Sequence, residues 1–362
     1  MLYHLLYPMK DYFIGFNVFR YVTFRASYAL LTAMAVSLVL GPILIAFHRR
    51  YALGESIRDD GPQTHMTKEG TPTMGGTLIL MALLVSTLLW ADLTNKYVWL
   101  LLFTALGFGL IGFADDYRKV ILKRKSGLGV REKLVAQCIV ALGVACFLYF
   151  DPRGHPFAAH LTIPFFKRAV PDLGLLYIPF VVLVIVGASN AVNITDGLDG
   201  LAIGPVIIAT VAYVAIAYVT GHSKFAKYLN IIYIRGAGEV AVFGAAIIGA
   251  GLGFLWYNAY PAEIFMGDVG SLALGGVLGA AAVITKHELL LLVVGGLFVM
   301  EALSVILQVA YFRWSGGKRI FKMAPLHHHF EVKGWEEPKV IIRFWIIAII
   351  LALLSLSTLK LR

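Results

Sequence analysis

The sequence predicts an all-α integral membrane protein with about ten transmembrane helices. Hydrophobic residues make up 59% of the 362-residue chain and charged residues only 14%, whereas a soluble domain typically contains about 25% charged residues. The apolar residues are gathered into runs that reach, or nearly reach, the roughly 20 residues that a helix needs to cross a bilayer. These observations indicate one polytopic membrane domain over residues 1–362, with no separate soluble domain.

Ten apolar runs are expected to form these helices. The eighth is short and rich in glycine, which favours a helix packed closely against its neighbours. The stretch before the first run has no basic segment followed by an apolar core and a small-residue cleavage site, so we expect it to stay in the mature chain. In chain order the runs cover residues 22–47, 74–90, 98–114, 134–150, 175–193, 200–219, 240–257, 269–284, 288–312 and 340–359.

Ten crossings place both termini on one side of the membrane and the loops after the first, third, fifth, seventh and ninth helices on the other. These five loops hold 17 Lys and Arg residues, against 12 in the segments of the opposite side. Because basic residues are enriched in cytoplasmic loops, we expect the five loops to be cytoplasmic and both termini periplasmic.

The formal net charge of +10 does not indicate a nucleic-acid partner. The basic residues lie in short segments between apolar runs, where they set topology and meet anionic headgroups of the lipid bilayer. Cys138 and Cys146 lie eight residues apart in one run, about 12 Å along a helix, which is too far for a mutual disulfide.

Carboxylates collect on the predicted cytoplasmic face. Asp115 and Asp116 end the third run, and Asp268 precedes the eighth. A carboxylate just before a helix is often an N-cap, but several carboxylates on one face repel one another unless a cation or protonation offsets them. Oxygen ligands without cysteine favour Mg²⁺ or Mn²⁺ over zinc.

Loops three and four add a second group of polar candidates. Four of them follow one another at intervals of three, so that a continuing helix would align them on one side; a polar helix end with a glycine C-cap is the alternative. The members of this group are Asn190, Asn193, Asp196, Asp199, Asn258 and Phe265.

Loop five contains three consecutive histidines, His327, His328 and His329, close to Lys322. Such a tract can bind a metal, but neighbouring side chains diverge, so donors for phosphate oxygens are the more economical interpretation. A solvated basic loop is the third possibility. Loop one contributes Lys68 with nearby threonines and glycines, a mixture suited to polar ligand groups.

The ninth run carries Glu301 and Gln308, seven residues apart and therefore on one helix face. Intramembrane ionisable residues are costly and often functional. Glu301 can orient the helix bundle, line a cavity or make a structural hydrogen bond, and Gln308 lies near enough to the cytoplasmic end to reach a substrate.

Carboxylates for a divalent ion, interspersed Lys, Arg and His, and glycine-flanked turns together indicate phosphoryl transfer. Because the site lies at a membrane surface, we expect one substrate to be a lipid phosphate. Within the loop after the third helix, Arg118 and Lys119 are placed to attract that phosphate.

Five motifs carry a resemblance to a known family: "TPTMGG", "DDYRK", "NAVNITDGLDGLA", "FMGDVGSLALGG" and "MAPLHHHFE", in this order between apolar runs. The chain closely resembles, over essentially its whole length, the phospho-N-acetylmuramoyl-pentapeptide transferases, or translocase I. These enzymes belong to the polyprenyl-phosphate N-acetylhexosamine-1-phosphate transferases. The paired aspartates and "DGLDG" suit that wider superfamily, and "TPTMGG" and "PLHHHFE" are more specific to the pentapeptide transferases.

The resemblance implies a Mg²⁺-dependent reaction in the bacterial inner membrane. UDP-N-acetylmuramoyl-pentapeptide would react with undecaprenyl phosphate to give lipid I and UMP, the first membrane step of peptidoglycan synthesis. The family also works as a homodimer, so we expect a homodimer here.

The resemblance also implies residue roles. Asp268 resembles the Mg²⁺ ligand, and Asp115 and Asp116, the pair tied to catalysis, are further candidate ligands. His327 and His328 resemble phosphate-side or acid–base residues. Phe265 resembles the residue that stacks on uracil. The other substrate-binding candidates are Lys68, Thr73, Asn190, Asn193, Asp196, Leu198, Asp199, Asn258, Gln308, Ala324 and His329.

Two chemical routes and three other functions stay open from the sequence. The lipid phosphate can attack the β-phosphorus directly, which we favour because a phosphate monoester is largely dianionic at pH 7, or an aspartate can form a phospho-aspartate first. The other functions are a sister transferase for a smaller UDP-N-acetylhexosamine, a secondary transporter, and a non-catalytic polyprenyl-lipid binder. A transporter would carry charged or broken helices near the midplane.

Overall fold

The computed structural model describes residues 1–51, 70–123, 127–151, 159–164, 166 and 170–361. Its described part is helical and contains no β-sheet. Nine of its helices are long and apolar enough to cross a membrane, and α3 is a shorter apolar helix of 15 residues. These ten helices are α2 (Val22–Arg50), α3 (Gly76–Trp90), α4 (Lys96–Val120), α5 (Val130–Phe150), α6 (Tyr177–Thr195), α7 (Ile203–Thr220), α9 (Gly238–Asn258), α10 (Gly267–Ile284), α12 (Gly296–Trp314) and α14 (Glu337–Leu361).

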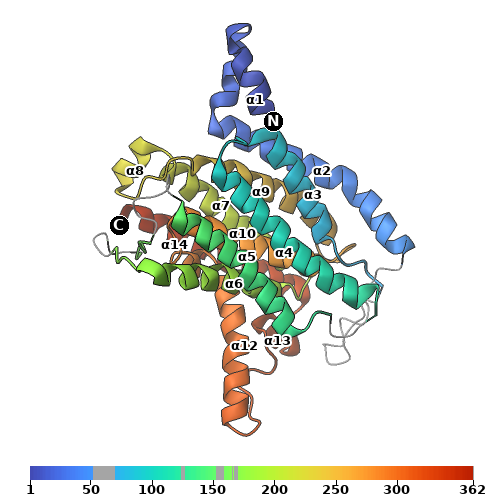
Figure 1. Cartoon of the computed structure of the whole chain (residues 1–362). Helices are drawn as coiled ribbons and strands as arrows, with labels where there is room; N and C mark the ends of the chain where they lie inside the picture. The colour runs from blue at the N-terminus through green and yellow to red at the C-terminus, as the bar shows by residue number, and fades with distance from the viewer. Residues whose placement is uncertain (52–69, 124–126, 152–158, 165, 167–169, 362) are drawn as a thin grey trace.

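Short helices connect or flank these segments. At the N-terminus, α1 and the 3₁₀ turns after it project from one end of the bundle (Figure 1). The short helices are α1 (Leu2–Leu6), η1 (Tyr7–Asp11), η2 (Ile14–Arg20), η4 (Gly174–Leu176), α8 (Ser223–Leu229), α11 (Leu291–Val294) and α13 (Leu326–Val332).

The predicted ninth helix is wrong in one respect, because the run 288–312 is not continuous. It divides at Gly295, whose ψ of 21° is not helical, into α11 and α12. The break falls at the glycine pair Gly295–Gly296, where the backbone has least preference for helix. Beyond the break, α12 projects from the bundle (Figure 1) and exposes apolar residues such as Leu303 and Ile306, as expected for a helix that faces lipid.

The glycine-rich helix α10 is the most buried of the spanning helices described, as the sequence predicts. Its glycines sit directly on neighbouring helices. A Cβ on Gly275 would lie 2.6 Å from the Ala188 carbonyl oxygen of α6, and one on Gly276 would lie 3.0 Å from the ring of Phe108 in α4. Small residues of this kind let helix backbones approach closely inside a membrane. The first turn of α10 lies directly against α3 and α4, because a Cβ on Gly76 would meet Gly270 and one on Gly112 would meet Asp268.

The helix ends sort into two groups, which supports the predicted alternation of crossings. At one end of the bundle, Arg25 near the start of α2 pairs with Glu239 at the start of α9, with Nη1–Oε2 at 2.7 Å. The same carboxylate accepts the Asp92 backbone N–H just after α3. The end of α4 and the starts of α3 and α10 meet at the opposite end, where the predicted motifs lie.

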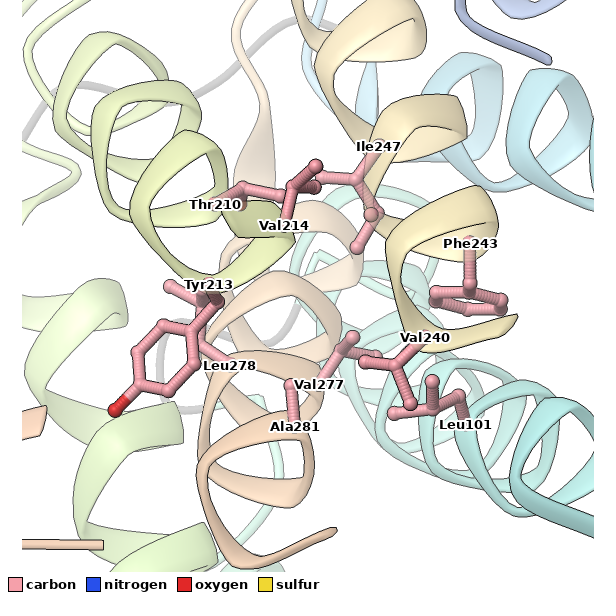
Figure 2. Close-up of a pocket in the computed structure, with 11 residues that line it drawn as sticks. Leu101, Thr210, Tyr213, Val214, Val240, Phe243, Ile247, Val277, Leu278 and Ala281 are labelled. Carbon is pink, nitrogen blue, oxygen red and sulfur yellow. The ribbon is translucent and has the colours of Figure 1, made fainter. Parts of the chain in front are cut away.

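A small apolar cavity lies between α4, α7, α9 and α10 (Figure 2). Its lining includes Leu101, Phe243 and Leu278, and its two hydroxyl groups are both engaged elsewhere. Thr210 donates to the Val206 carbonyl oxygen and Tyr213 to the His287 carbonyl oxygen. The cavity therefore offers no free side-chain hydroxyl group to a charged substrate.

Candidate active site

Three aspartates meet where α4 ends and α10 begins. One carboxylate oxygen from each of Asp115, Asp116 and Asp268 lies within 4.8 Å of the others, and no other group of three metal-ligating side chains was found among the described residues. Asp115 and Asp116 are buried, and Asp268 is partly exposed. Asp116 Oδ2 accepts the Val269 backbone N–H at 3.2 Å, which ties the end of α4 to the first turn of α10.

A glycine makes this meeting possible. Gly112 lies one helical turn before Asp116, and a Cβ there would be 2.2 Å from the Asp268 carbonyl oxygen. Any larger residue would push the two helices apart. The "GFADDYRK" stretch thus combines the small residue that permits contact with the carboxylates that the contact brings together.

Two lysines offset the charge of the aspartates. Lys119 Nζ lies 2.6 Å from Asp115 Oδ2 and 2.9 Å from Asp268 Oδ2. Lys133 Nζ, from the first turn of α5, lies 2.8 Å from Asp268 Oδ2 and 3.5 Å from Asp115 Oδ2. Arg118 and Lys119 were both predicted to attract the lipid phosphate. Lys119 lies beside the aspartates, whereas Arg118 pairs with Glu132 at the surface.

Lys133 is a residue of the site that was not predicted from the sequence. Its signal was available, because it is the last residue of loop two, directly before the predicted run 134–150 and on the same predicted membrane face as the aspartates. It was counted among a block of basic residues that set topology. Only the packing of α5 against α4 and α6 distinguishes it from its neighbours.

The aspartate cluster fits a divalent cation. It supplies three buried or partly buried carboxylate oxygens at ligating separation, which are the donors that Mg²⁺ prefers. Asn193 Nδ2 donates to Asp268 Oδ1 at 2.6 Å and lies 2.8 Å from Ser271 Oγ, so it fixes the direction of that carboxylate. Hydrogen bonds from neighbouring side chains commonly hold metal-binding carboxylates in the orientation that the ion requires.

The residues of loop three do not continue the helix as their spacing suggested. Helix α6 ends at Thr195, and Asp196 is its C-cap. Asp199 lies beyond it, is buried, and accepts the Ala262 backbone N–H at 3.0 Å. The backbone therefore matches the second interpretation, in which the helix has a polar end. The hydrogen bond to Ala262 connects Asp199 of loop three to loop four.

Asn190 and Asn258 make contacts within the protein. Asn190 Nδ2 donates to Gln137 Oε1 on α5 at 2.7 Å. Asn258 Oδ1 accepts the Gly200 backbone N–H at 3.0 Å, and its Nδ2 donates to the Ile264 carbonyl oxygen at 2.8 Å. Gly200 has a φ of +76°, a backbone conformation that glycine adopts without steric cost.

Leu198 belongs to a second apolar cluster between loop three and α14. It is 4% exposed and is grouped with Leu201, Val340 and Phe344. Its burial anchors the turn between Asp196 and Asp199 against α14.

A backbone ladder places Thr73 and Phe265 beside the aspartates. Phe265 donates its N–H to the Pro72 carbonyl oxygen and accepts the Gly75 N–H, both at 2.8 Å. A Cβ on Gly267 would be 2.7 Å from Asp116 Oδ2 and 3.1 Å from the Thr73 hydroxyl, which puts both groups against this turn. Lys68, the remaining candidate of loop one, lies outside the described residues.

The three histidines of loop five point to three different partners. His327 Nδ1 lies 3.2 Å from Glu301 Oε2, and His328 Nδ1 lies 2.7 Å from Glu331 Oε2. His329 Nδ1 accepts the Lys322 backbone N–H at 3.0 Å. Their divergence agrees with the expectation that one ion would not take all three.

The environment of His329 explains how its ring acts as an acceptor. Burial lowers the pKa of His329, and the nearby positive charges of Lys333 and Lys322 lower it further. The ring therefore stays neutral near pH 7, with Nδ1 free of a proton to accept the Lys322 N–H.

Gln308 and Ala324 lie along the same loop. Gln308 Oε1 accepts the backbone N–H groups of Ile320 at 3.1 Å and Phe321 at 3.0 Å, so this side chain braces loop five. Ala324 precedes Pro325, the N-cap of α13, which carries the histidines. His327 reaches loop three, because a Cβ on Gly197 would lie 2.3 Å from its Nε2.

The arrangement is thus one polar site at the ends of several apolar helices. Helices α4, α5, α6 and α10 supply the aspartates, the two lysines and Asn193. Helices α12 and α13 supply Glu301 and the histidines, and His327 packs against loop three. Carboxylates that can hold a divalent cation, next to ammonium groups that can bind phosphate oxygens, are suited to phosphoryl transfer. Their place at the helix ends suits a substrate that itself lies in a membrane.

Comparison with known proteins agrees with this chemistry. The family model for glycosyl transferase family 4 matches residues 98–286, which include all three aspartates. The phospho-N-acetylmuramoyl-pentapeptide-transferase signature 1 matches residues 68–80, which include the "TPTMGG" motif.

Curated relatives match over the full length of both chains. The phospho-N-acetylmuramoyl-pentapeptide-transferase of Desulfatibacillum aliphaticivorans is 61% identical over 363 residues. The enzymes of the same name from Thermodesulfovibrio yellowstonii and Pelobacter propionicus are each 59% identical over 362 residues. These matches do not favour the sister transferase, the transporter or the non-catalytic lipid binder. With its apolar helices and these full-length matches, the chain is a multi-pass membrane transferase and belongs to the phospho-N-acetylmuramoyl-pentapeptide-transferase family.

Proposed function

We propose that this protein transfers phospho-N-acetylmuramoyl-pentapeptide from its UDP-linked donor to undecaprenyl phosphate in the bacterial inner membrane. The products are lipid I and UMP, and the reaction begins the membrane stage of peptidoglycan synthesis. The observation that carries the proposal is the cluster of Asp115, Asp116 and Asp268 with Lys119 and Lys133 at the ends of apolar helices.

The reaction forms a bond between an oxygen of the lipid phosphate and the β-phosphorus of the donor. The bond between that phosphorus and the oxygen bridging to the α-phosphate breaks, and UMP leaves with the electron pair. The attacking phosphate monoester has a second pKa of about 6, so it is largely dianionic at pH 7 and needs little help from a base. This supports direct attack over a phospho-aspartate intermediate.

The side chains of the cluster have distinct tasks in this scheme. Asp268 would hold Mg²⁺, with Asp115 and Asp116 as further ligands, and the ion would supply positive charge to the diphosphate. Asn193 keeps the Asp268 carboxylate in one orientation. Lys119 and Lys133 bind phosphate oxygens and keep the two substrates from repelling one another.

The nucleoside and sugar are proposed to lie over loops three, four and five. Phe265 stacks on uracil, and Asp196, Asp199 and His328 contact polar groups of the donor. The remaining pocket candidates are Lys68, Thr73, Leu198, Asn258, Gln308, Ala324 and His329. The five loops lie in the cytoplasm, where the nucleotide donor is made, and the protein acts as a homodimer.

The experiment is an assay of UMP release by the purified protein with undecaprenyl phosphate and UDP-N-acetylmuramoyl-pentapeptide. We expect removal of Mg²⁺ with a chelator to lower the rate by at least about 100-fold, because the diphosphate charge then lacks its counter-ion, and added Mg²⁺ to restore it. UDP-N-acetylglucosamine serves as the control donor and should give no product.

Two results would contradict parts of the proposal. Full activity without divalent cations would contradict the metal role. UMP release from the donor alone, without lipid acceptor, would contradict direct attack and support the phospho-aspartate route.

A further inference from the structure

Glu301 and His327 form a buried pair, and the contact between them has no role in the proposed function so far. Glu301 on α12 is 0% exposed, and His327 at the start of α13 is 1% exposed. Glu301 Oε1 accepts the backbone N–H of His327 at 3.2 Å, and Oε2 lies 3.2 Å from the ring Nδ1. One carboxylate thus fixes both the backbone and the ring of this histidine.

The pair determines which ring nitrogen carries the proton. An ionised carboxylate can only accept hydrogen bonds, so the contact requires a proton on Nδ1. In the neutral ring Nε2 then carries a lone pair and acts as an acceptor. Among the described residues no hydrogen-bond partner for Nε2 is found, although the atom is buried.

The unpaired Nε2 faces the turn that follows Asp196. A Cβ on Gly197 would lie 2.3 Å from Nε2, and the glycine is what allows the ring to come so close. Burial of an acceptor without a donor is unfavourable, so a site that retains one gains when a ligand supplies the donor. This turn belongs to the proposed pocket for the nucleotide-sugar.

We propose that Glu301 is a positioning residue that holds the His327 ring with Nε2 directed at the Asp196–Gly197 turn. There Nε2 accepts a hydrogen bond from an O–H or N–H group of the nucleotide-sugar substrate. The inference rests on the proposed function, since that function supplies the substrate.

The first test compares two variants of Glu301. Glu301→Gln keeps one acceptor oxygen for Nδ1–H but places an amide N–H group beside the His327 backbone N–H, so kcat/KM for the nucleotide-sugar should fall less than in the leucine variant. Glu301→Leu has no acceptor, and kcat/KM should fall about 10- to 100-fold, the range for one lost hydrogen bond to a charged group. The loss should lie in KM for the nucleotide-sugar, with KM for undecaprenyl phosphate unchanged.

The second test works at His327 and does not depend on the stability of the Leu variant. A glutamine amide reaches the position of Nε2, whereas an asparagine amide reaches only that of Nδ1. We expect His327→Gln to retain more activity than His327→Asn, with equal melting temperatures. The Glu301→Leu/His327→Asn double variant should be no worse than the poorer single variant, because both act through one atom.

The outcomes separate the inference from the function on which it rests. Wild-type protein that releases no UMP would contradict the proposed function. Active wild-type protein with an unchanged Glu301→Leu variant, or with His327→Asn at least as active as His327→Gln, would overturn only the inference. Equal losses in Glu301→Gln and Glu301→Leu would also overturn it, because charge rather than ring orientation would then matter.

Discussion

At the residue scale, the polar contacts of the site converge on one carboxylate, that of Asp268. Asp268 contacts Lys119, Lys133 and Asn193 through its two oxygens. Each of these side chains comes from a different helix, so the position of the Asp268 carboxylate depends on the packing of α4, α5, α6 and α10. This dependence makes single substitutions informative.

Lys133 provides a sharp prediction because its side chain is 18% exposed and touches two of the three aspartates. Lys133→Met should lower kcat/KM for UMP release by about 100-fold, as expected for the loss of one preorganised charged donor. The matched control is Lys339→Met, which removes an exposed lysine at the start of α14.

The control should keep wild-type kinetics, and both variants should keep the wild-type melting temperature within a few degrees. A Lys133→Met variant with wild-type kcat/KM would show that this ammonium group only balances the charge of the aspartates.

At the element scale, the contact between α4 and α10 depends on Gly112. Gly112→Ala would place a methyl group 2.2 Å from the Asp268 carbonyl oxygen. We expect a loss of about 1–3 kcal/mol from overpacking, visible as a lower melting temperature, together with lower UMP release because Asp268 moves away from Asp116.

Gly187 on α6 offers the matched control, since nothing lies within 4 Å of a Cβ built there. Gly187→Ala should leave activity unchanged and leave stability equal or slightly higher, because alanine is the better helix former. Equal effects of the two substitutions would show that crowding at Gly112 does not position Asp268.

Asn190 tests whether a predicted substrate contact is an interhelical contact instead. Its amide pairs with Gln137, which is fully buried on α5. Asn190→Leu leaves the Gln137 amide unpaired and should cost about 1–3 kcal/mol of stability, whereas the Gln137→Leu/Asn190→Leu double variant should recover much of the loss.

Melting temperatures and KM values of the two single variants and the double variant distinguish the two roles. An unchanged KM for the nucleotide-sugar in Asn190→Leu would assign the residue to helix packing. A raised KM with an unchanged melting temperature would support the predicted substrate role.

Part of this fold and site can be predicted from the sequence, and part depends on packing between helices. Composition and run length predict ten crossings, because the bilayer fixes the length of an apolar helix. The alternation of crossings predicts that the aspartates share one face of the membrane. The division at Gly295 was missed because apolar periodicity continues across it, and Lys133 and the Glu301–His327 pair were missed because they depend on packing between helices distant in sequence.

At the scale of the whole molecule, the two ends of the bundle differ in kind. One end holds the aspartates, lysines and histidines. The other holds structural pairs such as Arg25–Glu239 and the Lys286–Tyr177 hydrogen bond, with Lys286 Nζ donating to the Tyr177 hydroxyl at 2.7 Å. In the proposed reaction a lipid phosphate and a soluble nucleotide meet at the first end, beside the aspartates, so the direction in which that end faces determines which compartment supplies the nucleotide.

The excess of basic residues predicts that this end faces the cytoplasm. The test uses a background with Cys138→Ser and Cys146→Ser, which removes both native thiols. Lys318→Cys then reports loop five, and Lys224→Cys reports α8 at the other end; both positions are exposed. With a maleimide that does not cross the inner membrane, we expect spheroplasts to label Lys224→Cys at once and Lys318→Cys only after the membrane is opened. The reverse pattern would place the aspartates outside the cell, away from the nucleotide donor, and so would contradict both the topology and the proposed reaction.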